Sequence, residues 1–257
     1  MNNVGKTVLY LDDQRRNALI EEHQFFVAQA KQRLLDQFTD LSMETEAQKV
    51  SEEAWNSLGK QFDPDRHDPA EFAELADHMG YERYRMLSEM REHVRFSMVA
   101  AFYHAFEKSL KEWIAAEFRH ITSSKSVKDR IWSATMDELF TLLKEGGTNF
   151  FVTKSYRDLR QCRLVVNAYK HGEGVSLDVI RRIAPDLIVP DDPDGFYKNF
   201  PVEFFDHTHL KIGDDDFDRF SEGIVEFWRG LPTYFRTTDF KKFPKWLEDA
   251  ANGPEGR

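Results

Sequence analysis

Residues 153–172 read TKSYRDLRQCRLVVNAYKHG and carry the clearest helical pattern in the chain. At about 100° per residue, one arc of the predicted helix is apolar and comprises Leu159, Cys162, Val165, Val166 and Tyr169. The opposite side carries a polar stripe of Tyr156, Arg160, Arg163, Asn167 and His171, with Lys170 at its edge. Gly172 stands where a helix typically ends in a left-handed residue. The stretch therefore predicts an amphipathic helix with one arc in a core.

Apolar residues recur at spacings of three and four residues throughout the first 170 residues, where Gly and Pro are scarce. The chain is therefore predicted to be mainly α. We expect an amphipathic helix over about 12–58 that breaks near Leu41. A long helix should follow over about 69–121, with a possible break at Gly80. Residues 127–144 predict a third helix, and the quoted stretch is the fourth. Together they suit an antiparallel helical bundle.

The region after Gly172 is richer in proline and contains the acidic run 191–194, so we expect mostly loop with short elements. The alternation over 205–212 predicts a short strand. Aspartates at 214–216 can cap a last helix. Two Asp-Pro pairs within 59–69 indicate a turn-rich linker.

Three parts are expected along the chain. They are an N-terminal helical arm (1–65), a helical bundle (66–180) and a C-terminal extension packed on the bundle (181–257). The 257 residues are 41% hydrophobic and 31% charged, which excludes collagen-like and globally disordered classes.

The net charge of −10 excludes a protein that coats nucleic acid with its whole surface. Residues 154–182 are nevertheless basic, because this segment contains seven Lys and Arg residues and only three Asp and Glu residues. Any nucleic-acid site must therefore be this local patch.

No apolar run approaches the ~18 residues that span a bilayer, and the first residues lack the pattern of a signal peptide. The single cysteine, Cys162, can form neither an internal disulfide nor a cysteine metal cage. We therefore expect a cytoplasmic protein with no membrane partner, in which Cys162 is an inert core thiol.

The run from Leu159 to Gly172 resembles the last core helix of HEPN (higher eukaryotes and prokaryotes nucleotide-binding) domains. The signature of that superfamily is Arg-Asn-x-x-x-His, and Asn167 to His171 matches its Asn-x-x-x-His half. The segment FYHAFEKSL, residues 102–110, is similar to the helix that packs against it. The resemblance covers residues 87–172.

This resemblance implies an antiparallel bundle, often dimeric, whose active members are metal-independent ribonucleases that need no cofactor. A histidine can move the proton of the attacking 2′-hydroxyl or of the leaving oxygen, while a cation neutralises the charge that builds on phosphorus. His171 is the candidate for proton transfer, with Asn167 positioning it and Arg163 and Lys170 supplying positive charge. The candidates for RNA binding are Arg160, Arg157, Lys154 and Tyr156.

One departure from the signature is chemically important, because Val166 stands where the arginine should be. Two hypotheses follow. The first is a metal-independent endoribonuclease of a toxin or phage-defence system. The second is a non-catalytic HEPN-like module that dimerises or docks a partner, such as an antitoxin or a defence-system protein, with a structural polar stripe.

Two further histidine motifs have simpler interpretations. His207 and His209 could place two imidazoles on one side of the predicted strand, but an isolated pair seldom makes a metal site, so no metal is expected. His104 and Glu107 share a face of the long helix, where they predict an internal polar pair or a group that orients His171.

A third short motif lies at the start of the chain. The sequence GKT at 5–7 lacks the upstream glycine spacing of a phosphate-binding loop. We expect these residues to belong to a free N-terminus.

Overall fold

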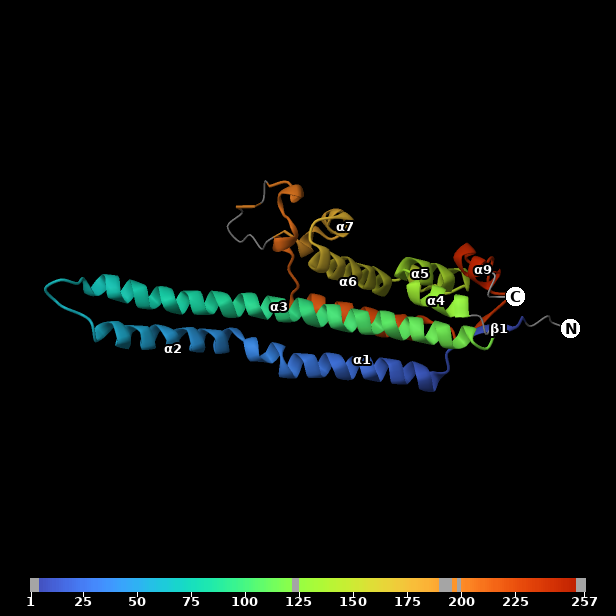
Figure 1. Cartoon of the computed structure of the whole chain (residues 1–257), viewed down its shortest axis with the longest axis horizontal. Helices are drawn as coiled ribbons and strands as arrows, with labels where there is room; N and C mark the ends of the chain where they lie inside the picture. The colour runs from blue at the N-terminus through green and yellow to red at the C-terminus, as the bar shows by residue number, and fades with distance from the viewer. Residues whose placement is uncertain (1–4, 122–124, 190–195, 198–199, 253–257) are drawn as a thin grey trace. The chain divides into compact units, whose positions relative to one another are not determined.

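The structure is a computed structural model that describes residues 5–121, 125–189, 196–197 and 200–252. Figure 1 shows its helices, which confirm the mainly α prediction. Their bounds are α1 (Asp13–Arg33), α2 (Asp40–Gly59), α3 (Pro69–Phe118), α4 (Lys125–Ser133), α5 (Met136–Glu145), α6 (Lys154–His171), α7 (Val175–Ile183), α8 (Asp214–Gly230) and α9 (Lys245–Asn252). No helix in the described part of the chain is both long and apolar enough to cross a membrane.

The chain divides into two compact units. The smaller unit is Val27–Met98, and the larger one combines Met1–Phe26 with Val99–Arg257. Both divisions fall inside long helices, α1 and α3. Residue 65, where we expected the arm to meet the bundle, lies in the loop that joins α2 to α3. This loop is inside the smaller unit and does not separate the two units.

The smaller unit is a helical hairpin in which α2 lies along the N-terminal half of α3 (Figure 1). Arg83 donates to the carboxylate of Glu46, and Ser51 donates to Asp77 at 3.2 Å. α3 does not break at Gly80. A side-chain carbon there would lie 3.0 Å from the carbonyl oxygen of Ala47, so this glycine allows the two helices to approach closely.

The core of the larger unit is largely aromatic and lies between α3, α6 and α8. Trp113 of α3 and Trp228 of α8 are buried, with ring centroids 6.1 Å apart. Phe106 packs edge-to-face against Phe227 at 5.0 Å. Such edge-to-face pairs are favoured by the ring quadrupole. The apolar periodicity of α8, which the sequence predicted, supplies one wall of this core.

A two-stranded antiparallel sheet joins the two ends of the larger unit. It pairs β1 (Thr7–Tyr10) with β2 (Tyr234–Arg236), and Lys6 accepts a further backbone hydrogen bond from Thr237 at 2.8 Å. The expectation of a free N-terminus at residues 5–7 is therefore wrong. The buried guanidinium of Arg16 secures the same end of the unit by donating to the carbonyl oxygens of Trp228 and Leu231, at 2.5 and 2.7 Å.

The strand expected over 205–212 does not form. Short 3-10 turns, η4 (Val202–Phe204) and η5 (His207–His209), occupy this part of the chain. The carboxylate of Asp206 accepts from the backbone N–H of Thr208 at 2.9 Å and so favours a turn over a strand. Phe205, Leu210 and Ile212 are buried in this stretch, but the spacing of five residues between the first two does not fit the alternation of a strand.

Helix boundaries differ from the predicted ones where side chains cap the backbone. Thr135 and Glu138 form a capping box that starts α5, so residues 127–144 belong to two helices rather than one. Thr39 caps α2, and the first helical segment therefore breaks over 34–39, before Leu41. α7 forms where mostly loop was expected, and the acidic run 191–194 lies outside the described residues.

Candidate functional site

Helix α6 has the limits that its sequence predicts. The side chain of Thr153 accepts from the backbone N–H of Tyr156 at 3.2 Å, and Gly172 ends the helix with a φ of +70°. The arc of Leu159, Cys162, Val165 and Val166 is buried, whereas Tyr169 is 37% exposed and lies at the edge of the core. Burial raises the pKa of Cys162, as expected for an inert core thiol.

Val166, which stands at the position of the signature arginine, faces the protein interior. Val166 is 2% exposed, and its neighbour Val165 is fully buried. A guanidinium at this position would lose its hydration without gaining a solvent-facing phosphate. Any cation that acts beside His171 must therefore come from another position.

Arg163 is engaged within the protein. Its guanidinium donates to both carboxylate oxygens of Asp137 on α5, at 2.5 and 2.6 Å. The hydrogen bonds from Arg163, followed by the charges of Arg163 and Arg160, lower the pKa of Asp137. Such bidentate pairing fixes the orientation of the guanidinium group. Arg163 thus ties α6 to the first turn of α5.

The other candidate residues divide between the surface and the core. Tyr156 packs in an aromatic cluster with Phe140, Phe150 and Phe151, at centroid distances of 5.0 to 6.0 Å. Asn167 is half-buried. Of the candidate residues on α6, those that remain exposed are Lys154, Arg157, Arg160, Lys170 and His171. The basic face of this helix is therefore present, with Arg163 and Tyr156 occupied in packing.

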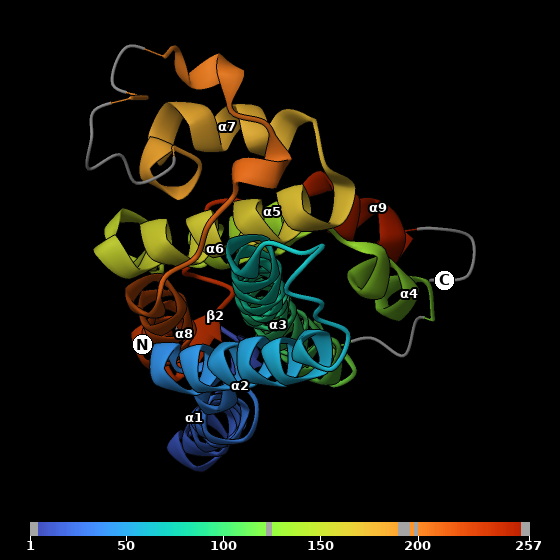
Figure 2. The same ribbon diagram turned by 90° about the vertical axis from the view of Figure 1, so that its left-hand side faces the viewer.

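A second imidazole lies at the C-terminal end of α6. His207 packs against Gly172, where a side-chain carbon would lie 3.7 Å from three atoms of the imidazole ring. Glu173 holds His207 by accepting from its backbone N–H at 3.1 Å and by contacting Nδ1 at 3.3 Å. Arg181 of α7 contacts the same carboxylate at 3.3 Å and donates to the carbonyl oxygen of Phe205. Figure 2 shows the turn segment beside α7.

The sequence did not indicate this arrangement. His207 and His209, which the sequence predicted side by side on a strand, make different contacts, since His209 Nδ1 lies 3.0 Å from Asp206 Oδ1. Hydrogen bonds from Thr208, and then from His209, lower the pKa of Asp206 to about 2. No group of three or more His, Cys, Asp or Glu side chains is placed to hold a metal among the described residues.

His104 and Glu107 form a polar pair on α3, but the pair lies at the surface and is not the internal pair that the sequence predicted. Nδ1 of His104 lies 3.7 Å from Oε2 of Glu107, whose other oxygen accepts from Lys111 at 2.8 Å. His104 is about half exposed. The contacts of this pair are therefore made along α3 itself.

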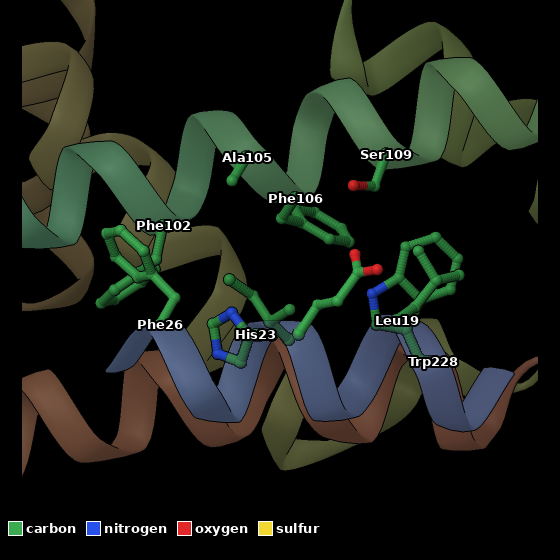
Figure 3. A pocket seen from close by; sticks show the side chains of 10 residues that line it. Leu19, His23, Phe26, Phe102, Ala105, Phe106, Ser109 and Trp228 are labelled. Atoms are coloured by element: carbon green, nitrogen blue, oxygen red, sulfur yellow. The ribbon is translucent and has the colours of Figure 1, made fainter. Parts of the chain in front are cut away.

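A separate pocket opens between α1, α3 and α8 of the larger unit (Figure 3). Its cavity volume is about 230 Å³. The lining is mostly apolar and aromatic, with three polar side chains, and comprises Leu19, Glu22, His23, Phe26, Phe102, Ala105, Phe106, Ser109, Ile224 and Trp228. His23 projects from α1 and Ser109 from α3 (Figure 3).

His23 is one of two titratable side chains that line this pocket, with Glu22. Its Nε2 and the hydroxyl of Ser221 share a hydrogen bond at 2.9 Å, and its ring meets Phe102 edge-to-face. Burial lowers the pKa of His23 to about 4, so the imidazole is neutral at neutral pH. The sequence contained a local signal for the burial of His23. It follows Leu19 by four residues and precedes Phe26 by three, spacings that place the three side chains on one face of a helix.

Comparisons with models of protein families, with curated proteins and with solved structures found no match to this chain.

Proposed function

We propose that this protein is a HEPN-like, metal-independent endoribonuclease of a toxin or phage-defence system, acting in the cytoplasm, with His171 as a general acid or base. One observation carries the proposal: two exposed imidazoles lie near the C-terminal end of α6. His171 is on the last turn of the helix, and His207 packs against the adjacent Gly172. The basic face of α6 leads to the same end.

Two imidazoles allow the two proton transfers of RNA cleavage to be shared. One imidazole accepts the proton of the 2′-hydroxyl as its oxygen attacks the adjacent phosphorus. The other donates a proton to the 5′-oxygen as the P–O bond to that oxygen breaks. The products are a 2′,3′-cyclic phosphate and a 5′-hydroxyl. Contact between Glu173 and Nδ1 of His207 orients that ring and leaves its Nε2 for the substrate.

The positive charge beside phosphorus is assigned to Lys170, which is exposed and adjacent to His171. Arg163 is assigned a positioning role, because Asp137 already occupies its guanidinium. Lys154, Arg157 and Arg160 are exposed along α6 and suit contacts with more distant phosphates. Asn167, half-buried one turn before His171, suits the positioning of that histidine.

A specific observation also favours the second candidate function, a non-catalytic module that dimerises or docks an antitoxin or another defence protein. Two members of the polar stripe, Arg163 and Tyr156, make intramolecular contacts with Asp137 and with an aromatic cluster. If His171 served the same purpose, its replacement would reduce stability, and there would be no nuclease activity to lose.

The test compares the purified chain with His171→Ala and His207→Ala on single-stranded RNA in excess chelator. His120→Ala is the matched control, because His120 is also exposed and follows the end of a helix. Loss of a proton-transfer group typically costs about 10²- to 10⁴-fold in rate. We expect that loss for both site variants at unchanged melting temperature, and wild-type rates for the control. Intact RNA with the wild type, together with unfolding of His171→Ala, would support the second function instead.

Lys170→Ala tests the cation separately. We expect weaker RNA binding as well as a lower rate, with a smaller effect at high salt, because phosphate contacts release counterions. Glu112→Ala or another change in a distant acidic side chain should leave both unchanged. Equal losses at low and high salt would argue against a phosphate contact by Lys170.

A further inference from the structure

The walls of the pocket between α1, α3 and α8 suit the aromatic or aliphatic part of a ligand. Phe102 and Phe106 of α3 are buried beside it, and Trp228 of α8 meets Phe106 edge-to-face at 5.9 Å. Phe26 of α1 is 37% exposed and lines the same space. Figure 3 shows these rings around the cavity. Burial of apolar ligand surface against such walls is favourable.

The cavity volume limits the size of a ligand. An engineered apolar cavity of about 150 Å³ in another protein holds benzene. The present cavity, of about 230 Å³, therefore has room for one ring and a short chain. Nucleotides and larger cofactors exceed this space.

The polar lining determines the charge of the ligand. Among the described residues that line the pocket, Glu22 is a carboxylate and none is Lys or Arg. His23 is neutral at neutral pH because burial lowers its pKa to about 4, and Ser109 adds an uncharged hydroxyl. The pocket lining thus has a formal charge of −1, provided by a side chain at its exposed edge.

We propose that this pocket binds a small organic cation, a protonated amine on a single aromatic ring with a short chain. The ring occupies the space between Phe102, Phe106 and Trp228. The ammonium group lies at the edge, where it donates charge-assisted hydrogen bonds to the carboxylate of Glu22 and to the hydroxyl oxygen of Ser109. The faces of the surrounding rings also attract a cation. This site is independent of the proposed nuclease site on α6.

Three probes of similar shape test the charge preference by calorimetric titration of the full chain: 2-phenylethylamine, 2-phenylethanol and phenylacetate. We expect the amine to bind at least about tenfold more tightly than the alcohol, which corresponds to about 1.4 kcal/mol. Phenylacetate should bind most weakly, because its carboxylate meets Glu22. Equal affinities for the three probes, tighter binding of phenylacetate, or no binding of the amine at millimolar concentration would overturn the proposal.

Two variants assign the binding to this pocket. Glu22→Gln should remove the advantage of the amine over the alcohol, whereas Glu21→Gln, a change in the adjacent exposed carboxylate, should preserve it. Ala105→Leu at the exposed rim should weaken all three probes by filling the mouth without overpacking the core. Unchanged amine affinity in both Glu22→Gln and Ala105→Leu would show that the probe binds elsewhere, and the proposal would be wrong.

Discussion

Gly223 of α8 lies directly against the backbone of Leu159 of α6. A side-chain carbon at Gly223 would be 3.2 Å from the backbone nitrogen of Leu159 and equally close to the carbonyl oxygen of Ser155. Both neighbours belong to helix backbone and cannot rotate away as a side chain can. This contact therefore sets how closely the helix that carries the candidate site packs on the aromatic core.

We predict that Gly223→Ala lowers the free energy of unfolding by about 1 to 3 kcal/mol, the usual cost of overpacking. Thermal denaturation followed by circular dichroism measures the change. Gly230→Ala in the same helix is the control, because a carbon there would make an ordinary contact of 3.5 Å with Phe150. Equal effects of the two substitutions would show that the close approach to Leu159 does not determine the loss of stability.

The Arg163–Asp137 pair should contribute modestly to stability. The side chain of Asp137 is 69% exposed, so solvent screens the interaction. We expect a coupling energy of about 0.2 to 1 kcal/mol from a double-mutant cycle with Arg163→Ala and Asp137→Ala. The coupling should fade as pH falls through the lowered pKa of Asp137, because protonation removes its charge. A cycle with no coupling at neutral pH would contradict a positioning role for Arg163.

His23 should make the protein sensitive to acid. In the folded chain it stays neutral down to about pH 4, whereas in the unfolded chain it takes up a proton near pH 6.5. Between these values the unfolded chain binds more protons, so the free energy of unfolding decreases as pH falls, by at most about 3 kcal/mol. Denaturant titrations of wild type and His23→Gln at several pH values measure it. The wild type should lose more stability than the variant over this interval, and parallel profiles would contradict the prediction.

We predict a homodimer in which the stripe of Arg160, Arg163, Asn167 and His171 on α6 lies close to the two-fold axis. Val175 and Phe204, which follow α6 and precede His207, are 81% and 68% exposed, as expected of apolar side chains at an interface. Light scattering at tens of micromolar should give twice the chain mass. Phe204→Asp should give monomers, whereas Phe25→Asp, an exposed phenylalanine on α1, should not. A monomeric wild type would refute the dimer.

Local signals explain why the sequence predicted α6 from Thr153 to Gly172. The cap, the left-handed glycine and the apolar arc all lie within the helix or beside it. Non-local pairings left no such signal. β1 and β2 lie at opposite ends of the chain and are too short to show a clear alternation.

The candidate site shows the same division. His171, Lys170 and Asn167 follow from the polar stripe of one helix, but the contact of His207 with Glu173 joins residues 34 positions apart. The sequence also placed His207 on a predicted strand over 205–212. This was wrong, because the side chain of Asp206 caps η5 and so favours a turn over a strand. The engagement of Arg163 depends on where α5 packs, which its own helix cannot reveal.

The chemical ends of the RNA products test the proposed mechanism most directly. Purified protein is incubated with end-labelled single-stranded RNA in excess chelator, and the ends are identified by mass spectrometry. Attack by the 2′-hydroxyl with proton transfer by His171 and His207 predicts 2′,3′-cyclic phosphate and 5′-hydroxyl ends, and no cleavage of RNA that is 2′-O-methylated throughout. Products with 3′-hydroxyl and 5′-phosphate ends, or RNA left intact by the wild-type protein, would contradict the account.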